Sequence, residues 1–101
     1  MADIAKQRAA ILARVLGGAG KASPEQRQAA FDNAGVTPDA ARVLVDKVAH
    51  EAWKIDDADV AALKAAGLSD DEIFELVACA ALGQASRQYE AALAALEQAG
   101  A

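Results

Sequence analysis

Apolar side chains recur along this chain at the three- and four-residue spacing of an α-helix, without the alternation of a half-buried strand. The stripe in residues 3–16 consists of Ile4, Ile11, Leu12, Val15 and Leu16. Gly17 and Gly18 follow it, and glycine commonly ends a helix. The pattern predicts an all-α chain that begins with a helix over residues 3–16.

The second predicted helix has a marked beginning. Ser23 suits the N-cap, Pro24 the first helical position, and Gln26 the third, which is the capping-box pattern. Asn33 and Gly35 can end this helix, so we expect it to be short.

Thr37 and Pro38 repeat the serine–proline arrangement and are expected to open a third helix. The larger apolar side chains of this helix are Leu44, Val45, Val48 and Trp53. Asp56 is then expected to cap a fourth helix that ends near Gly67.

The clearest local signal precedes the last helix. Ser69 and Glu72 form a capping box, while Leu68 and Ile73 occupy the two positions of a hydrophobic staple. The acids of this first turn could also suggest a metal site, but capping and the helix dipole account for them. We therefore predict a long helix over residues 70–98, and we expect neither a metal nor a cofactor.

Gly83 lies in the middle of this long helix, where glycine costs about 1 kcal/mol relative to alanine. Either the helix bends there, or another backbone approaches too closely for a side chain. We favour the close approach.

The composition limits the apolar area that the core can bury. Of 101 residues, 54% are hydrophobic, but 29 are alanine and only four are aromatic. A small domain built from alanine methyl groups buries little apolar area. We therefore expect a homo-oligomer, as a dimer, trimer or hexamer.

Charge and the remaining composition exclude several classes of protein. The net charge of −5 argues against a nucleic-acid partner. No apolar run reaches the length of a membrane span, so we expect no membrane association. One cysteine and one histidine make a disulfide framework or a zinc site implausible. These features suggest a cytoplasmic protein.

Acidic residues concentrate in the second half. Residues 56–101 carry nine acids and two bases, whereas residues 1–55 carry six acids and eight bases. We interpret the acidic half as a solvated face, with an electrostatic docking surface as the alternative.

Residues 62–81 read A-L-K-A-A-G-L-S-D-D-E-I-F-E-L-V-A-C-A-A. This segment resembles the alkylhydroperoxidase D-like, or carboxymuconolactone decarboxylase, superfamily. Its distinctive parts are Gly67, the S-D-D-E box and the Ile-Phe-Glu that follows. The resemblance implies a single domain of about five helices with an oligomer-forming core over residues 37–98. Residues 1–35 form an N-terminal helical extension that either completes the bundle or docks on a neighbouring subunit.

The peroxidase branch of that superfamily carries a Cys-x-x-Cys-x-x-x-His motif before the glycine. The corresponding positions of this chain are Ala52, Ile55 and Asp59. Thiol redox chemistry needs one thiolate to attack and a second to resolve. The chain therefore resembles a non-redox member, and our leading hypothesis is an oligomeric binding, scaffold or accessory protein and not an enzyme.

An enzyme of the decarboxylase or lactone-handling kind is the alternative. His50 is its first candidate for acid–base chemistry and Glu51 its second. Neighbouring helical residues do not face each other, however, and a histidine near a helix C-terminus also suits the dipole.

Four other side chains have a structural and a functional interpretation. Cys79 is expected to pack in the core, and a single-thiol peroxidase using it is a weaker alternative. Trp53 is expected to anchor the third helix against the last, and ligand stacking is the other interpretation. Arg87 and Tyr89 are expected at a contact between subunits, with substrate binding as the alternative.

Overall fold

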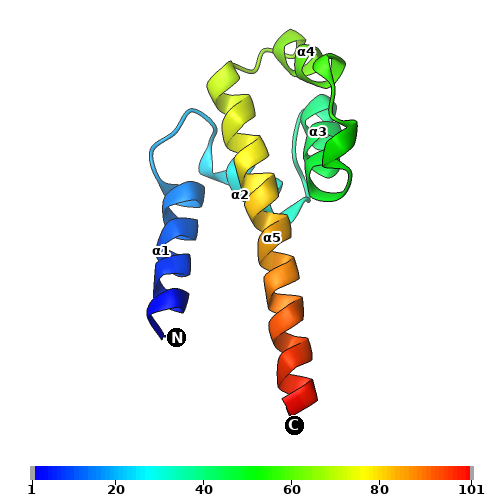
Figure 1. The fold of residues 1–101 in the computed structure, drawn as a ribbon. Helices are drawn as coiled ribbons and strands as arrows, with labels where there is room; N and C mark the ends of the chain where they lie inside the picture. Colours follow the sequence, from blue (N-terminus) through cyan, green and yellow to red (C-terminus); the bar gives the residue numbers. More distant parts are fainter. Residues whose placement is uncertain (1, 101) are drawn as a thin grey trace.

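The computed structural model describes residues 2–100, which form helices joined by short turns (Figure 1). The elements are α1 (Ala2–Gly17), α2 (Pro24–Asp32), α3 (Asp39–His50), the 3-10 turn η1 (Ala52–Lys54), α4 (Asp57–Ala65) and α5 (Asp70–Gly100). The predicted all-α architecture and the long C-terminal helix are confirmed. None of the helices described is both long and apolar enough to cross a membrane.

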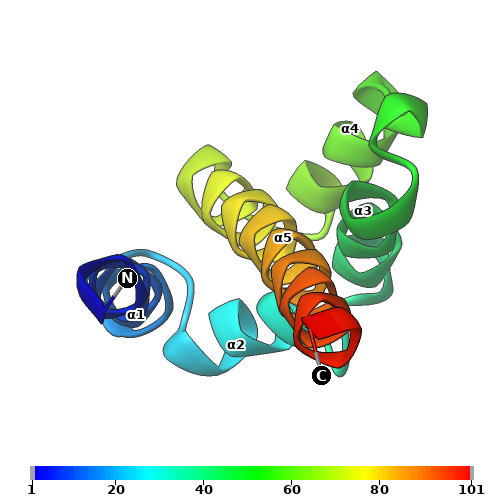
Figure 2. The same ribbon diagram turned by 60° about the horizontal axis from the view of Figure 1, so that its bottom comes forward.

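Helix α5 is the axis of the molecule. Its 31 residues span about 46 Å at 1.5 Å per residue, which is most of the 51 Å length of the molecule. Figure 2 shows α1 on one side of α5 and both α3 and α4 on the other. Helices α1 and α5 run in opposite directions, with both termini at the same end of the molecule (Figure 1).

The core lies where α2 and α3 pack against the first half of α5. Its buried hydrophobic residues are Ala22, Ala30, Val36, Ala41, Leu44, Val45, Ala49, Leu63, Ile73, Leu76, Cys79 and Ala80. Five of these twelve are alanine, so the core contains few large side chains. By contrast, every residue of α5 from Arg87 to Gly100 is exposed.

Two capping boxes fix the starts of α4 and α5. The Ser69 and Glu72 side chains accept from each other's backbone N–H, at 3.2 and 3.0 Å. Asp56 and Asp59 do the same at 3.1 and 3.0 Å. Because both boxes are local, the sequence predicts these starts correctly.

The start of α2 is as predicted, with Ser23 as the N-cap and Pro24 at the first helical position, whereas the start of α3 differs from the expected pattern. Ser23 Oγ accepts from the Gln26 N–H at 3.1 Å, but the Gln26 side chain does not complete the box. Its amide instead donates to the carbonyl of Thr37 across the α2–α3 connection. The expectation that Thr37 begins α3 is wrong, because Pro38 is the N-cap and no side chain caps this helix.

Gly83 marks a close approach of two backbones, as favoured from the sequence. A β-carbon at this position would overlap the carbonyl of Phe31 at the end of α2. Arg87, one turn further along α5, donates from Nη1 to the same carbonyl oxygen at 2.7 Å. The absence of a side chain at Gly83 therefore sets the distance between α2 and α5.

Candidate functional site

The acid–base candidates lie at the end of α3. The His50 side chain is 53% exposed, with Nε2 3.8 Å from Asp46 Oδ1 and 3.4 Å from Asn33 Nδ2. The Glu51 carboxylate instead faces Lys54 at 3.3 Å. The structure thus does not bring His50 and Glu51 together, and no observation favours acid–base catalysis by this pair.

The three positions of the absent thiol motif do not lie on one helix. Ala52 is exposed in η1, Ile55 follows that turn, and Asp59 belongs to the first turn of α4. Asp59 has two structural partners, the N-cap N–H of Asp56 and the Lys47 ammonium at 2.9 Å. The Asp59 carboxylate therefore ties α3 to α4.

This ion pair is electrostatically distinct from the surface pairs of the chain. The side chains of Lys47 and Asp59 are only 27% and 12% exposed. Their hydrogen bond lowers the pKa of the Asp59 carboxyl and raises the pKa of the Lys47 ammonium from their ordinary values. Both shifts favour the charged forms, so the pair stabilises the fold around neutral pH.

The acids at the start of α5 have caps and ion pairs as their partners. Glu72 belongs to the capping box, and Asp70 pairs with Lys64 at 2.9 Å. Within residues 2–100, no group of three or more histidine, cysteine, aspartate or glutamate side chains is placed to hold a metal ion.

Trp53 does not anchor α3, so that interpretation is wrong. Helix α3 ends at His50, and the indole is 78% exposed in η1. Arg87 donates to the Phe31 carbonyl and to Gln84, whereas the Tyr89 ring lies under the Arg8 guanidinium at 5.1 Å. The structure thus assigns Arg87 and Tyr89 contacts within the chain.

A groove of about 520 Å³ separates α1 from the middle of α5. It is lined mainly by apolar residues, namely Ile4, Ile11 and Leu12 from α1 and Leu82, Ala85 and Tyr89 from α5. Arg8 spans its rim, reaching Glu90 at 3.4 Å. Since Ile4 and Ile11 are each 55% exposed, the chain leaves this apolar surface largely uncovered.

The stripe on α5 continues beyond the groove. Leu82, Tyr89 and Leu96 stand seven residues apart, and Leu93 lies beside them. Leu93 and Leu96 are 39% and 68% exposed. The C-terminal end of α5 extends past the other helices (Figure 1). A heptad stripe is typical of a helix that packs against another helix along its length.

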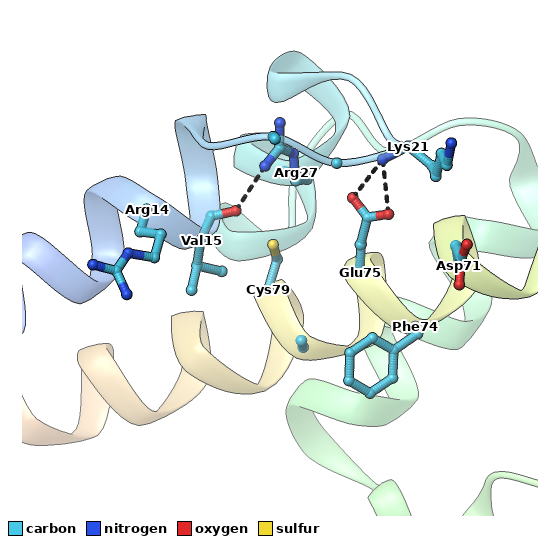
Figure 3. A pocket seen from close by; sticks show the side chains of 11 residues that line it. Arg14, Val15, Lys21, Arg27, Asp71, Phe74, Glu75 and Cys79 are labelled. Carbon is cyan, nitrogen blue, oxygen red and sulfur yellow. Dashed lines mark hydrogen bonds between the residues drawn. The ribbon is translucent and has the colours of Figure 1, made fainter.

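A second hollow, of about 440 Å³, lies where the end of α1, the α1–α2 loop, α2 and the start of α5 meet (Figure 3). Arg27 of α2 lines it and is only 4% exposed. Its Nη1 donates to the Val15 carbonyl at 3.0 Å, whereas its buried Nε–H has no acceptor among the described residues. Arg27 was not predicted as a site residue, although its spacing from Ala30 and Phe31 places it on the buried face of α2.

Cys79 also borders this hollow but contributes to the core. Its side chain is 1% exposed, which confirms the core-packing interpretation. Burial raises the pKa of the Cys79 thiol; Arg27 opposes this shift and Glu75 adds to it. A thiol with a raised pKa is a poor nucleophile at neutral pH, which argues against a single-thiol peroxidase.

Comparison with protein-family models, with curated proteins and with solved structures yields no match to this chain.

Proposed function

We propose that this chain is a non-redox, homo-oligomeric scaffold or binding protein, and a divergent relative of the carboxymuconolactone decarboxylase-like family. The observation that carries the proposal is the heptad stripe on α5, which runs from the α1–α5 groove onto the exposed end of the helix. Among the residues whose burial is described, eight large hydrophobic side chains are exposed, against six large aliphatic ones in the core. Covering them would substantially increase the apolar area that the protein buries.

The occupant of the groove is a second copy of the chain. The stripe is symmetric about Tyr89, because Leu82 and Leu96 lie seven residues before and after it. A two-fold axis near Tyr89 would pair two α5 helices antiparallel and place Leu96 of the second copy beside Leu82. The two α1 helices would then flank the pair and complete a four-helix arrangement.

Charge favours the same pairing. Helix α1 carries three bases, Lys6, Arg8 and Arg14, against Asp3. The end of α5 that would enter the groove carries Glu90 and Glu97 against Arg87. The net positive charge of α1 and the net negative charge of the incoming end of α5 attract each other and oppose a parallel arrangement of the two acidic ends.

Light scattering behind a sizing column tests the proposal over a range of protein concentrations. We expect a dimer mass for the natural sequence. Leu96→Glu should weaken association by at least about a hundredfold, because it places a charge in an apolar contact. Gln98→Glu is the matched control, since it adds the same charge on the opposite face of α5 and should leave the dimer intact.

A monomer of 10.3 kDa at every concentration, with a cooperative melt, would refute the proposal. Equal dissociation by Leu96→Glu and Gln98→Glu would refute the assignment of this stripe as the contact between the two copies. A trimer or hexamer that Leu96→Glu dissociates would retain the interface and overturn the two-fold arrangement.

A further inference from the structure

Arg27 is a buried cation without a carboxylate partner. It forms an ion pair with none of the acids that the structure describes, and its one hydrogen bond goes to the neutral Val15 carbonyl. Burial of a charged side chain is costly unless an opposite charge and hydrogen bonds compensate it. The end of α1, whose carbonyls carry partial negative charge, supplies only part of that compensation.

The nearest acid on α5 is already committed elsewhere. Both oxygens of Glu75 accept from the Lys21 N–H, at 3.0 and 2.9 Å (Figure 3). Oε1 also accepts from the Ala22 N–H at 3.3 Å. These loop amides compensate the Glu75 carboxylate. Among the described residues the Arg27 Nε–H has no acceptor, and Arg27 lines a hollow large enough for a small molecule.

The other walls of the hollow define what could enter it. Val15, Phe74 and Ala78 provide an apolar surface, and Arg14 and Lys21 add two cationic side chains. The lining also includes Asp71 and Glu75. These two carboxylates repel a dianion more strongly than a monoanion, while the apolar wall favours a hydrocarbon portion.

We infer that this hollow binds a small organic carboxylate, with the Arg27 guanidinium as the anion partner and the Val15, Phe74 and Ala78 surface holding the hydrocarbon part. The planar guanidinium matches a carboxylate through parallel N–H donors. The site lies beside the start of α5, apart from the stripe around Tyr89. It therefore stands independently of the proposed oligomerisation.

Titration calorimetry with hexanoate tests the inference on the full chain. We expect saturable binding that is at least about tenfold tighter than that of hexanamide, which has the same length without the charge. Inorganic phosphate should bind more weakly than hexanoate, because Asp71 and Glu75 repel it. Backbone amide shifts of Lys21 and Ala22 should follow hexanoate occupancy.

Two variants locate the site. Arg27→Met should abolish hexanoate binding and retain the helical fold, since an apolar side chain of similar length often replaces a buried charge without loss of stability. Arg42→Met is the control, because the Arg42 side chain is exposed and pairs with the exposed Asp39. If Arg27→Met fails to fold, Ala78→Leu provides the second test, since it fills the hollow and leaves Arg27 unchanged.

Three results would overturn the inference. They are equal binding of hexanoate and hexanamide, unchanged hexanoate binding by Arg27→Met or Ala78→Leu, and preferential binding of phosphate. Because none of them depends on the oligomeric mass, failure here is distinguishable from failure of the proposed dimer.

Discussion

Gly83 of α5 faces the carbonyl oxygen of Phe31 at a separation that excludes a β-carbon. The contact joins the middle of the longest helix to the end of α2. Backbone atoms form both sides of this contact, so neither side can move away as a flexible side chain could.

Gly83→Ala should therefore destabilise the fold, although alanine has the higher helix propensity. We expect a loss of about 3 kcal/mol or more, because α2 and α5 must separate. Urea unfolding followed by circular dichroism measures the change. Gly17→Ala is the matched control, because nothing lies within 4 Å of the added methyl group, and it should be neutral or stabilising by up to about 1 kcal/mol.

The Lys47–Asp59 pair predicts a pH dependence of stability. Because the folded pKa of Asp59 lies below its ordinary value of 3.8, its contribution is present above that pH and is lost as the pH falls further. Asp59→Asn should thus be less stable than the natural sequence at pH 7. The difference should disappear in strong acid.

The Lys47–Asp59 pair also predicts a loss of stability at alkaline pH. The folded pKa of Lys47 lies above 10.5, so its contribution is complete below that pH and is lost as the pH rises through the folded value. Urea unfolding across the pH range measures the loss of stability at both acid and alkaline pH. Asp57→Asn is the control, since it removes an acid from the same turn of α4; an equal pH profile for both variants would contradict the role of the pair.

Cys79 should resist thiol reagents in the native state. Its side chain is 1% exposed and burial raises its pKa, so both access and thiolate formation are disfavoured. The reaction with a disulfide reagent should be slow in buffer and accelerate with the unfolding transition in urea. A rapid stoichiometric reaction without denaturant would show that the thiol is accessible.

Trp53 provides an optical test of the α3–α4 connection. As the sole tryptophan it should emit like an indole in water and be readily quenched by iodide, since it is 78% exposed. Unfolding should then shift its emission very little. Blue-shifted emission from dissociated monomers would mean that the indole packs against the protein, whereas a shift only on association would place it at a subunit contact.

Local signals allowed the helix boundaries to be predicted. Ser69 with Glu72 and Asp56 with Asp59 each encode a helix start within four residues. Gly83 in the middle of a helix indicated either a bend or a close backbone contact, and the structure shows the contact. Such features depend little on what the rest of the chain does.

The incorrect predictions concern residues whose positions and partners depend on the tertiary structure. Trp53 was assigned to α3, but that helix ends at His50 and leaves the indole in solvent. The capping role expected of Thr37 failed because Pro38 takes the N-cap position and Gln26 binds the Thr37 backbone. That Arg27 has no carboxylate partner among the described residues also could not be predicted. It depends on the hydrogen bonds that Glu75 accepts from the α1–α2 loop.

The exposed end of α5 has a consequence for the secondary structure itself. Residues 91–100 are all exposed along α5, and a helical segment of this length is marginal in water even when rich in alanine. A dissociated chain should therefore fray inward from Gly100, and its amide hydrogens there should exchange rapidly. Dilution would then lower the helical content, so that the circular dichroism signal would report the fraction of the protein that is associated.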